Sequence, residues 1–202
     1  MKKPTIAIVS VAAATALGTL VTACSSSSNT SSATSTSAGA ATPTSALAAP
    51  TDYTTLLIQG SDISGTPPDV FTPAEPPTQN PTGMPGAAVV FKNQDDSNRI
   101  RDTVLILPDA GGAANAMNGS VASLGNTVTG GNPQPVSVGN GGTMVSGTSP
   151  DNSKAVTVLL FTEGKAFVTL EFDGAPGDVV PSDFANGVAQ TQDAAIKKNL
   201  PG

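Results

Sequence analysis

The sequence has no histidine, no tryptophan and a single cysteine among its 202 residues. The absence of histidine excludes Ser-His and Cys-His nucleophile pairs and every metal site that needs an imidazole. One cysteine cannot form an intramolecular disulfide, so an apolar core has to hold the fold together. With 9 Lys or Arg against 15 Asp or Glu, the net charge is −6, and the basic surface that nucleic acids require is lacking. We therefore expect no nucleic-acid partner, no metal, no cofactor and no catalytic residues.

The start of the chain has the pattern of an export signal. Two lysines precede an uncharged apolar stretch from residue 6 to residue 21. This stretch is too short and too rich in Ala and Thr for a spanning helix, which needs about 20 predominantly apolar residues. The sequence LVTAC at residues 20–24 resembles the lipobox of bacterial lipoproteins. The resemblance implies cleavage after Ala23 and attachment of acyl chains, palmitate among them, to Cys24. The alternatives are an ordinary secretory peptide with a chance cysteine and an unprocessed membrane anchor.

The composition divides the chain into a signal peptide (1–23), a tether (24–50) and one domain (51–202). Between residues 25 and 50 there is no charge, and Ser, Thr and Ala predominate, so this segment cannot bury enough apolar surface to fold. We expect a disordered tether that follows the lipidated cysteine. The domain is long enough for a real core. Its segment 65–86 holds seven prolines and is expected to run extended over the surface without regular structure.

Alternating apolar residues predict two hairpins in the domain. One joins 87–92 to 100–107 through an Asn- and Asp-rich turn, and the other joins 155–162 to 165–172 around Glu163-Gly164. Two further short strands are expected at 135–138 and 143–146, separated by a glycine-rich turn. In the last strand, residues 166, 168, 170 and 172 share one face, which should be core, whereas the other face is mixed.

Capping residues predict two helices. Asp109 is placed to cap a helix that ends near Gly125, and Ser182 a helix that ends near Leu200. Residues 53–58 are read as a helical turn or a packed edge, and residues 61–62 as an N-cap. The predicted fold class is therefore α+β: a mostly antiparallel sheet of about five or six strands packed against two helices, after the disordered N-terminal tether.

The lipobox, the Ser/Thr/Ala tether and one acidic α+β domain together resemble the small lipoproteins of mycobacteria and other actinobacteria. The layout of the domain, in which strand 104–107 precedes a small-residue helix and a late hairpin precedes a closing helix, is similar to two groups. These are the LpqN-type lipoproteins, with their Mog1/PsbP-like sandwich, and the extracellular sensor domain of a mycobacterial receptor kinase. The resemblance implies an extracytoplasmic location at the cell membrane. It carries over no functional residue except Cys24.

Any catalysis would have to come from carboxylates, because two of them could flank a glycosidic bond. The candidates are Asp102, Asp109, Glu163, Glu171, Asp173, Asp178 and Asp183. Glu171 is the best single candidate because it interrupts an apolar strand, although the alternation also places it on the solvent side. Asp95 and Asp96 could gather oxygens around Ca²⁺, but a solvated turn explains them better.

These observations lead to three hypotheses. The first is a non-catalytic, membrane-anchored extracytoplasmic lipoprotein, with the acyl chains on Cys24 in the membrane. Its domain would bind a small apolar or lipid-like ligand, or a partner protein of the cell envelope. The small residues of helix 110–124 suggest this, because they could leave volume beside the sheet. The alternatives are a carboxylate-dependent envelope hydrolase and a structural or scaffold protein.

Overall fold

The computed structural model describes residues 52–63 and 70–200. The predicted signal peptide, Cys24 and the tether lie outside the described residues. The strands are β1 (Thr72–Pro73), β2 (Thr78–Gln79), β3 (Gly86–Lys92), β4 (Arg99–Ile106), β5 (Gln134–Val136), β6 (Gly142–Thr148), β7 (Ala155–Glu163) and β8 (Ala166–Gly174). The helices are α1 (Ala110–Ser123), α2 (Ser182–Asn199) and the 3₁₀ turns η1 (Tyr53–Leu56), η2 (Gly60–Asp62), η3 (Pro81–Gly83) and η4 (Leu124–Asn126).

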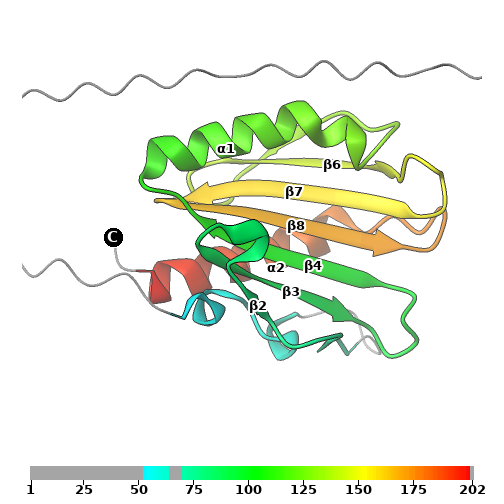
Figure 1. The fold of residues 1–202 in the computed structure, drawn as a ribbon. Helices are drawn as coiled ribbons and strands as arrows, with labels where there is room; N and C mark the ends of the chain where they lie inside the picture. Colours follow the sequence, from blue (N-terminus) through cyan, green and yellow to red (C-terminus); the bar gives the residue numbers. More distant parts are fainter. Residues whose placement is uncertain (1–51, 64–69, 201–202) are drawn as a thin grey trace, which may run out of the picture. The chain divides into compact units, whose positions relative to one another are not determined.

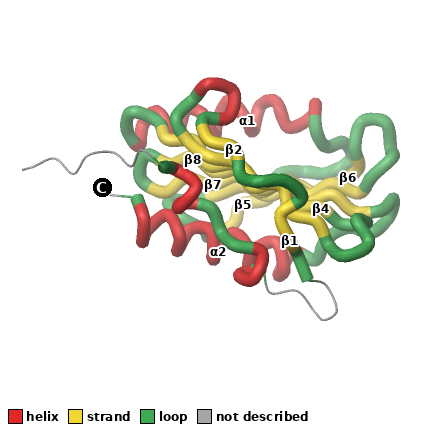
Figure 2. Tube along the Cα trace, turned by 60° about the horizontal axis from the view of Figure 1, so that its bottom comes forward, coloured by secondary structure: helices red, strands yellow, loops and turns green. Residues whose placement is uncertain are grey.

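All eight of these strands belong to one sheet, and the two α-helices lie on opposite faces of it (Figures 1 and 2). The strand order is β1-β3-β4-β8-β7-β6-β5, with β2 also paired to β3, and the pairing between these strands is antiparallel throughout. The predicted α+β class is confirmed. Both predicted hairpins form, with β3 on β4 and β7 on β8.

The proline-rich segment differs from the prediction, because it adds two short strands to the sheet. β1 pairs with Phe91 and Lys92 of β3, and β2 pairs with Ala87 and Ala88. Proline lacks the N–H that a long ladder needs, but a two-residue strand at an edge requires few donors. The segment therefore covers the outer edge of β3, and the sheet has eight strands instead of five or six.

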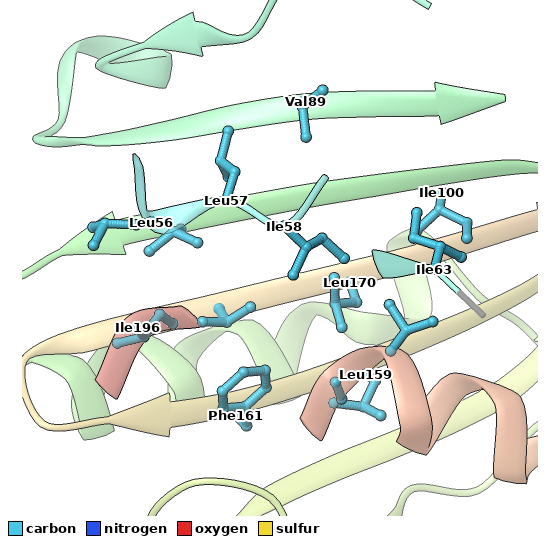
Figure 3. Close-up of a cluster of buried hydrophobic side chains, with 14 of the residues drawn as sticks. Leu56, Leu57, Ile58, Ile63, Val89, Ile100, Leu159, Phe161, Leu170 and Ile196 are labelled. Atoms are coloured by element: carbon cyan, nitrogen blue, oxygen red, sulfur yellow. The ribbon is translucent and has the colours of Figure 1, made fainter. Parts of the chain in front are cut away.

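The main core lies between the sheet, α2 and residues 52–63, which we call the strap. Leu56, Leu57, Ile58 and Ile63 of the strap are buried there against sheet residues such as Leu170 (Figure 3). The four predicted inward positions of β8 all belong to this core. On the other face, α1 covers a second, smaller cluster around Phe167. The mixed character predicted for that face of β8 is confirmed.

The helix ends follow the sequence in part. Asp109 caps α1 as predicted, because its Oδ1 accepts the N–H of Gly112 at 2.7 Å. The predicted N-cap of α2 was wrong by one residue. Ser182 is the first helical residue, and Pro181 occupies the N-cap position without a side-chain hydrogen bond. Residues 61–62 do not begin a helix at Ile63, because they close the 3₁₀ turn η2, whose N-cap is Gln59.

Candidate functional site

Glu171, the favoured catalytic candidate, is held in an ion pair. Its Oε1 lies 3.0 Å from Nη1 of Arg101 on the neighbouring strand β4, and its side chain keeps 19% exposure. Burial raises the pKa of Glu171, and the positive charge of Arg101 opposes that rise. Asp173, two residues further on the same face, is paired with Lys154 at 2.8 Å. Both carboxylates are therefore neutralised by neighbouring cations.

The acidic pair at the first hairpin forms a turn. Oδ1 of Asp95 accepts the backbone N–H and the hydroxyl of Ser97, whereas both oxygens of Asp96 bind Arg99 at 2.9 Å. Within residues 52–63 and 70–200, no group of three or more His, Cys, Asp or Glu side chains is placed to hold a metal ion. The segment thus forms the turn that was predicted for it.

A cavity of about 230 Å³ lies beside the first turn of α2, and it is lined by three phenylalanines, Phe71, Phe172 and Phe184. We call it the phenylalanine cavity. The ring of Phe184 lies 6.2 Å from that of Phe172, edge to face, and 6.2 Å from that of Phe71. These are the spacings at which aromatic pairs attract one another. The rings therefore form a pre-organised apolar wall.

The remaining lining comes from the starts and ends of neighbouring elements. It consists of Asn98, Arg99, Ile100, Asp173, Gly174, Asp178, Val180 and Pro181. Arg99 is already bound by both oxygens of Asp96, and Asp173 is paired with Lys154. Val70 and Val179 adjoin lining residues in the chain and are 57% and 46% exposed, among the few large apolar side chains at the described surface. The cavity therefore combines a wall of aromatic rings with polar lining residues, of which Arg99 and Asp173 are already paired.

The helix that the sequence suggested as the site packs closely instead. Ala113 of α1 is fully buried in the second cluster, and a Cβ on Gly112 would lie 3.3 Å from Leu107. Small residues thus bring α1 down onto the sheet. The phenylalanine cavity was not predicted, because Phe71 lies about a hundred residues before Phe172 and Phe184, and only the fold brings the three rings together.

A second feature that the sequence signalled weakly is a buried polar pair in the main core. Asp102 and Gln192 are both 0% exposed. Asp102 occupies an inward position of β4 between Ile100 and Val104, and Gln192 lies between Val188 and Ile196 on the apolar side of α2. Neither burial was predicted, although the alternation of the strand and the spacing of the helix carry the signal for both. Gln192 binds the strap, whereas Asp102 has no hydrogen-bond partner among the described residues.

No protein-family model and no curated protein sequence matches this chain. A solved structure to which it is similar is the extracellular domain of PknH from Mycobacterium tuberculosis, at 12% identity and a TM-score of 0.47. The similarity covers 72% of this chain and 95% of that domain. Among the described residues, no helix combines the length and hydropathy needed to cross a bilayer. A likeness this distant does not define a function, which has to be argued from this chain's own residues.

Proposed function

We propose that this protein is a lipid-anchored, extracytoplasmic binding protein whose domain takes a small apolar ligand in the phenylalanine cavity. The observation that carries the proposal is the cavity itself, with three aromatic rings and no unpaired cation among its lining residues in the described chain. The cavity volume of about 230 Å³ is below the range of roughly 300–1,000 Å³ that is typical of pockets for drug-sized ligands. The occupant is therefore a small apolar molecule or the end of a longer apolar chain.

The ion pairs of Glu171 and Asp173 favour a binding function over hydrolysis. A glycosidase needs one carboxyl group that protonates the leaving group and a second that acts as nucleophile or base. Glu171 and Asp173 are instead each engaged by a cation. Two carboxylates, Asp173 and Asp178, do line the cavity, but Asp173 is paired with Lys154, and no Ser, Cys, Thr or Lys stands among the lining residues as a nucleophile. We therefore assign the cavity to binding and no catalytic role to these residues.

The ligand is tested by solvent extraction and native mass spectrometry of the full chain, purified in detergent from a host that processes lipoproteins. We expect a co-purifying molecule of defined mass. Val180→Trp places an indole in the cavity and should reduce that molecule about tenfold or more. Val90→Trp is the matched control, because Val90 is half-buried on the opposite side of β3 from the main core. A ligand retained equally by both variants would contradict the assignment, and a clean apo-mass would favour a scaffold.

The anchor is tested at Cys24, the only cysteine in the chain. A thioether to diacylglycerol needs the thiol, and more than one acyl chain is required for stable anchoring. Cys24→Ser should therefore move the protein from the detergent phase to the aqueous phase and remove the acyl mass from its N-terminal peptide. Ser25→Ala, one residue away, should leave both unchanged. A wild-type chain without acyl mass would contradict the anchor while leaving the cavity assignment intact.

A further inference from the structure

The strap is fastened to α2 by hydrogen bonds from side chains of the helix. Gln192 Oε1 accepts the N–H of Ile58 at 3.0 Å, and Gln192 Nε2 donates to the carbonyl of Leu56 at 2.7 Å. Asn199 Nδ2 donates to the carbonyl of Thr55 at 2.8 Å. The same segment inserts its apolar side chains into the main core (Figure 3). The strap is thus a short cover held by backbone-to-side-chain bonds and by apolar burial.

Asp102 lies in the core beneath this cover. Its strand neighbours are Val89 on β3 and Leu170 on β8, both buried in the main core. Neither carboxyl oxygen has a hydrogen-bond partner among the described residues. The backbone of Ile58 approaches closely enough to affect the ionisation of Asp102, but its N–H donates to Gln192. A carboxyl in this position is unfavourable when charged.

The ionisable groups of the surrounding elements point elsewhere. Asp52 and Asp62 of the strap bind backbone groups at its surface, and Tyr53 packs against the edge of the core. Asp193 of α2 pairs with Lys197. The other charged residues of these elements lie on the opposite face of the sheet or at the exposed ends of α2: Lys92, Arg99, Arg101, Glu171, Asp173, Asp183 and Lys198. Among the described residues, no cation therefore lies where it could balance a negative charge on Asp102.

Burial consequently raises the pKa of Asp102 to about 8, and the backbone of Ile58 offsets only part of that rise. Once water reaches the carboxyl, its pKa returns to the ordinary value near 4. Between about pH 4 and pH 8, Asp102 is therefore protonated in the closed form and ionised in any form in which it is hydrated. Opening releases one proton in this pH range. Closure is strongest at acidic pH and weakens as the pH rises.

We propose that the strap and Asp102 form an acid-closed clasp, in which loss of the Asp102 proton favours lifting of the strap from α2 and the sheet. Lifting this cover hydrates the carboxyl without separating the strands that flank it. An open clasp uncovers the apolar side of α2 on which the strap lies. The proposal does not depend on the ligand or on the lipid anchor.

The clasp is tested by hydrogen exchange of the full chain in detergent at pH 5, 6 and 7, with rates corrected for intrinsic exchange. One released proton predicts that the opening constant of strap amides rises about tenfold per pH unit. Strap amides should also exchange faster than those of β7 and β8 at each pH, because the opening is local. Asp102→Asn, a neutral isostere, should abolish the pH dependence.

Glu171→Gln is the matched control, because it removes a half-buried carboxylate from the opposite face of the sheet. It should preserve the tenfold dependence of the strap. Three results would overturn the clasp. The first is strap exchange that does not vary with pH in the wild type, and the second is a dependence that survives in Asp102→Asn. The third is strap protection equal to that of β7 and β8, which would mean that only global unfolding exposes Asp102.

Discussion

At the scale of single residues, one buried glutamine joins two distant parts of the chain. Gln192 of α2 satisfies both the N–H of Ile58 and the carbonyl of Leu56, which lie more than 130 positions earlier. Both backbone groups are in the core, where water cannot replace the lost bonds. Unpaired buried polar groups cost far more than an average hydrogen bond contributes, so Gln192 matters for stability out of proportion to its size.

Replacing Gln192 with Leu should therefore destabilise the domain by about 2–4 kcal/mol, because it leaves two buried backbone groups without partners. Urea denaturation of the full chain measures the effect. Gln190→Leu is the matched control on the same helix, and since Gln190 is exposed it should change the stability by less than about 0.5 kcal/mol. Equal stability of the two variants would show that the strap contributes little to the fold.

At the scale of elements, α1 shows how tertiary packing overrides weak local propensity. The helix contains three glycines, and it nevertheless forms because Ala113 and its neighbours pack on β7 and β8. Gly112 lies close to Leu107, whereas a Cβ on Gly119 would meet nothing within 4 Å. Glycine therefore allows close packing at residue 112, whereas at residue 119 it only costs stability.

Gly119→Ala should raise the free energy of unfolding by about 0.5–1 kcal/mol, because alanine loses less backbone entropy in a helix. Thermal unfolding followed by circular dichroism gives the shift in Tm. Gly147→Ala in β6 provides the opposite case, since its Cβ would collide with the carbonyl oxygen of Thr129 and should lower Tm. A decrease for Gly119→Ala would contradict the inference that glycine costs stability at this position.

The order of the main elements could be predicted from the sequence, because short stretches of sequence carry the signals for these elements. Strand pairs such as β7 and β8 carry their own alternation and turn, and Asp109 marks the start of α1. The strands β1 and β2 could not be predicted, because two residues hold no periodicity and their pairing depends on the exposed edge of β3. The prolines of the segment disfavour strands, but pairing with the open edge of β3 stabilises these two short strands.

At the scale of the whole molecule, the candidate site is a product of the fold. Phe71 immediately precedes β1, Phe172 lies in β8 and Phe184 in α2, and no sequence pattern links them. The predicted anchor, by contrast, needs only the residues around Cys24. A local motif was therefore enough to predict a location, whereas the candidate site could be found only from the three-dimensional arrangement of distant residues.

The most direct test of the binding function is photo-crosslinking in living cells, with benzoylphenylalanine in place of Phe184 in the full chain. Phe184 is half-buried at the wall of the phenylalanine cavity, so the probe reports what occupies it. The same probe at Val90 serves as the control. We predict a low-mass adduct of defined composition at position 184 that is absent at position 90. Crosslinks to proteins alone, or no adduct at position 184, would contradict a small-molecule binding function.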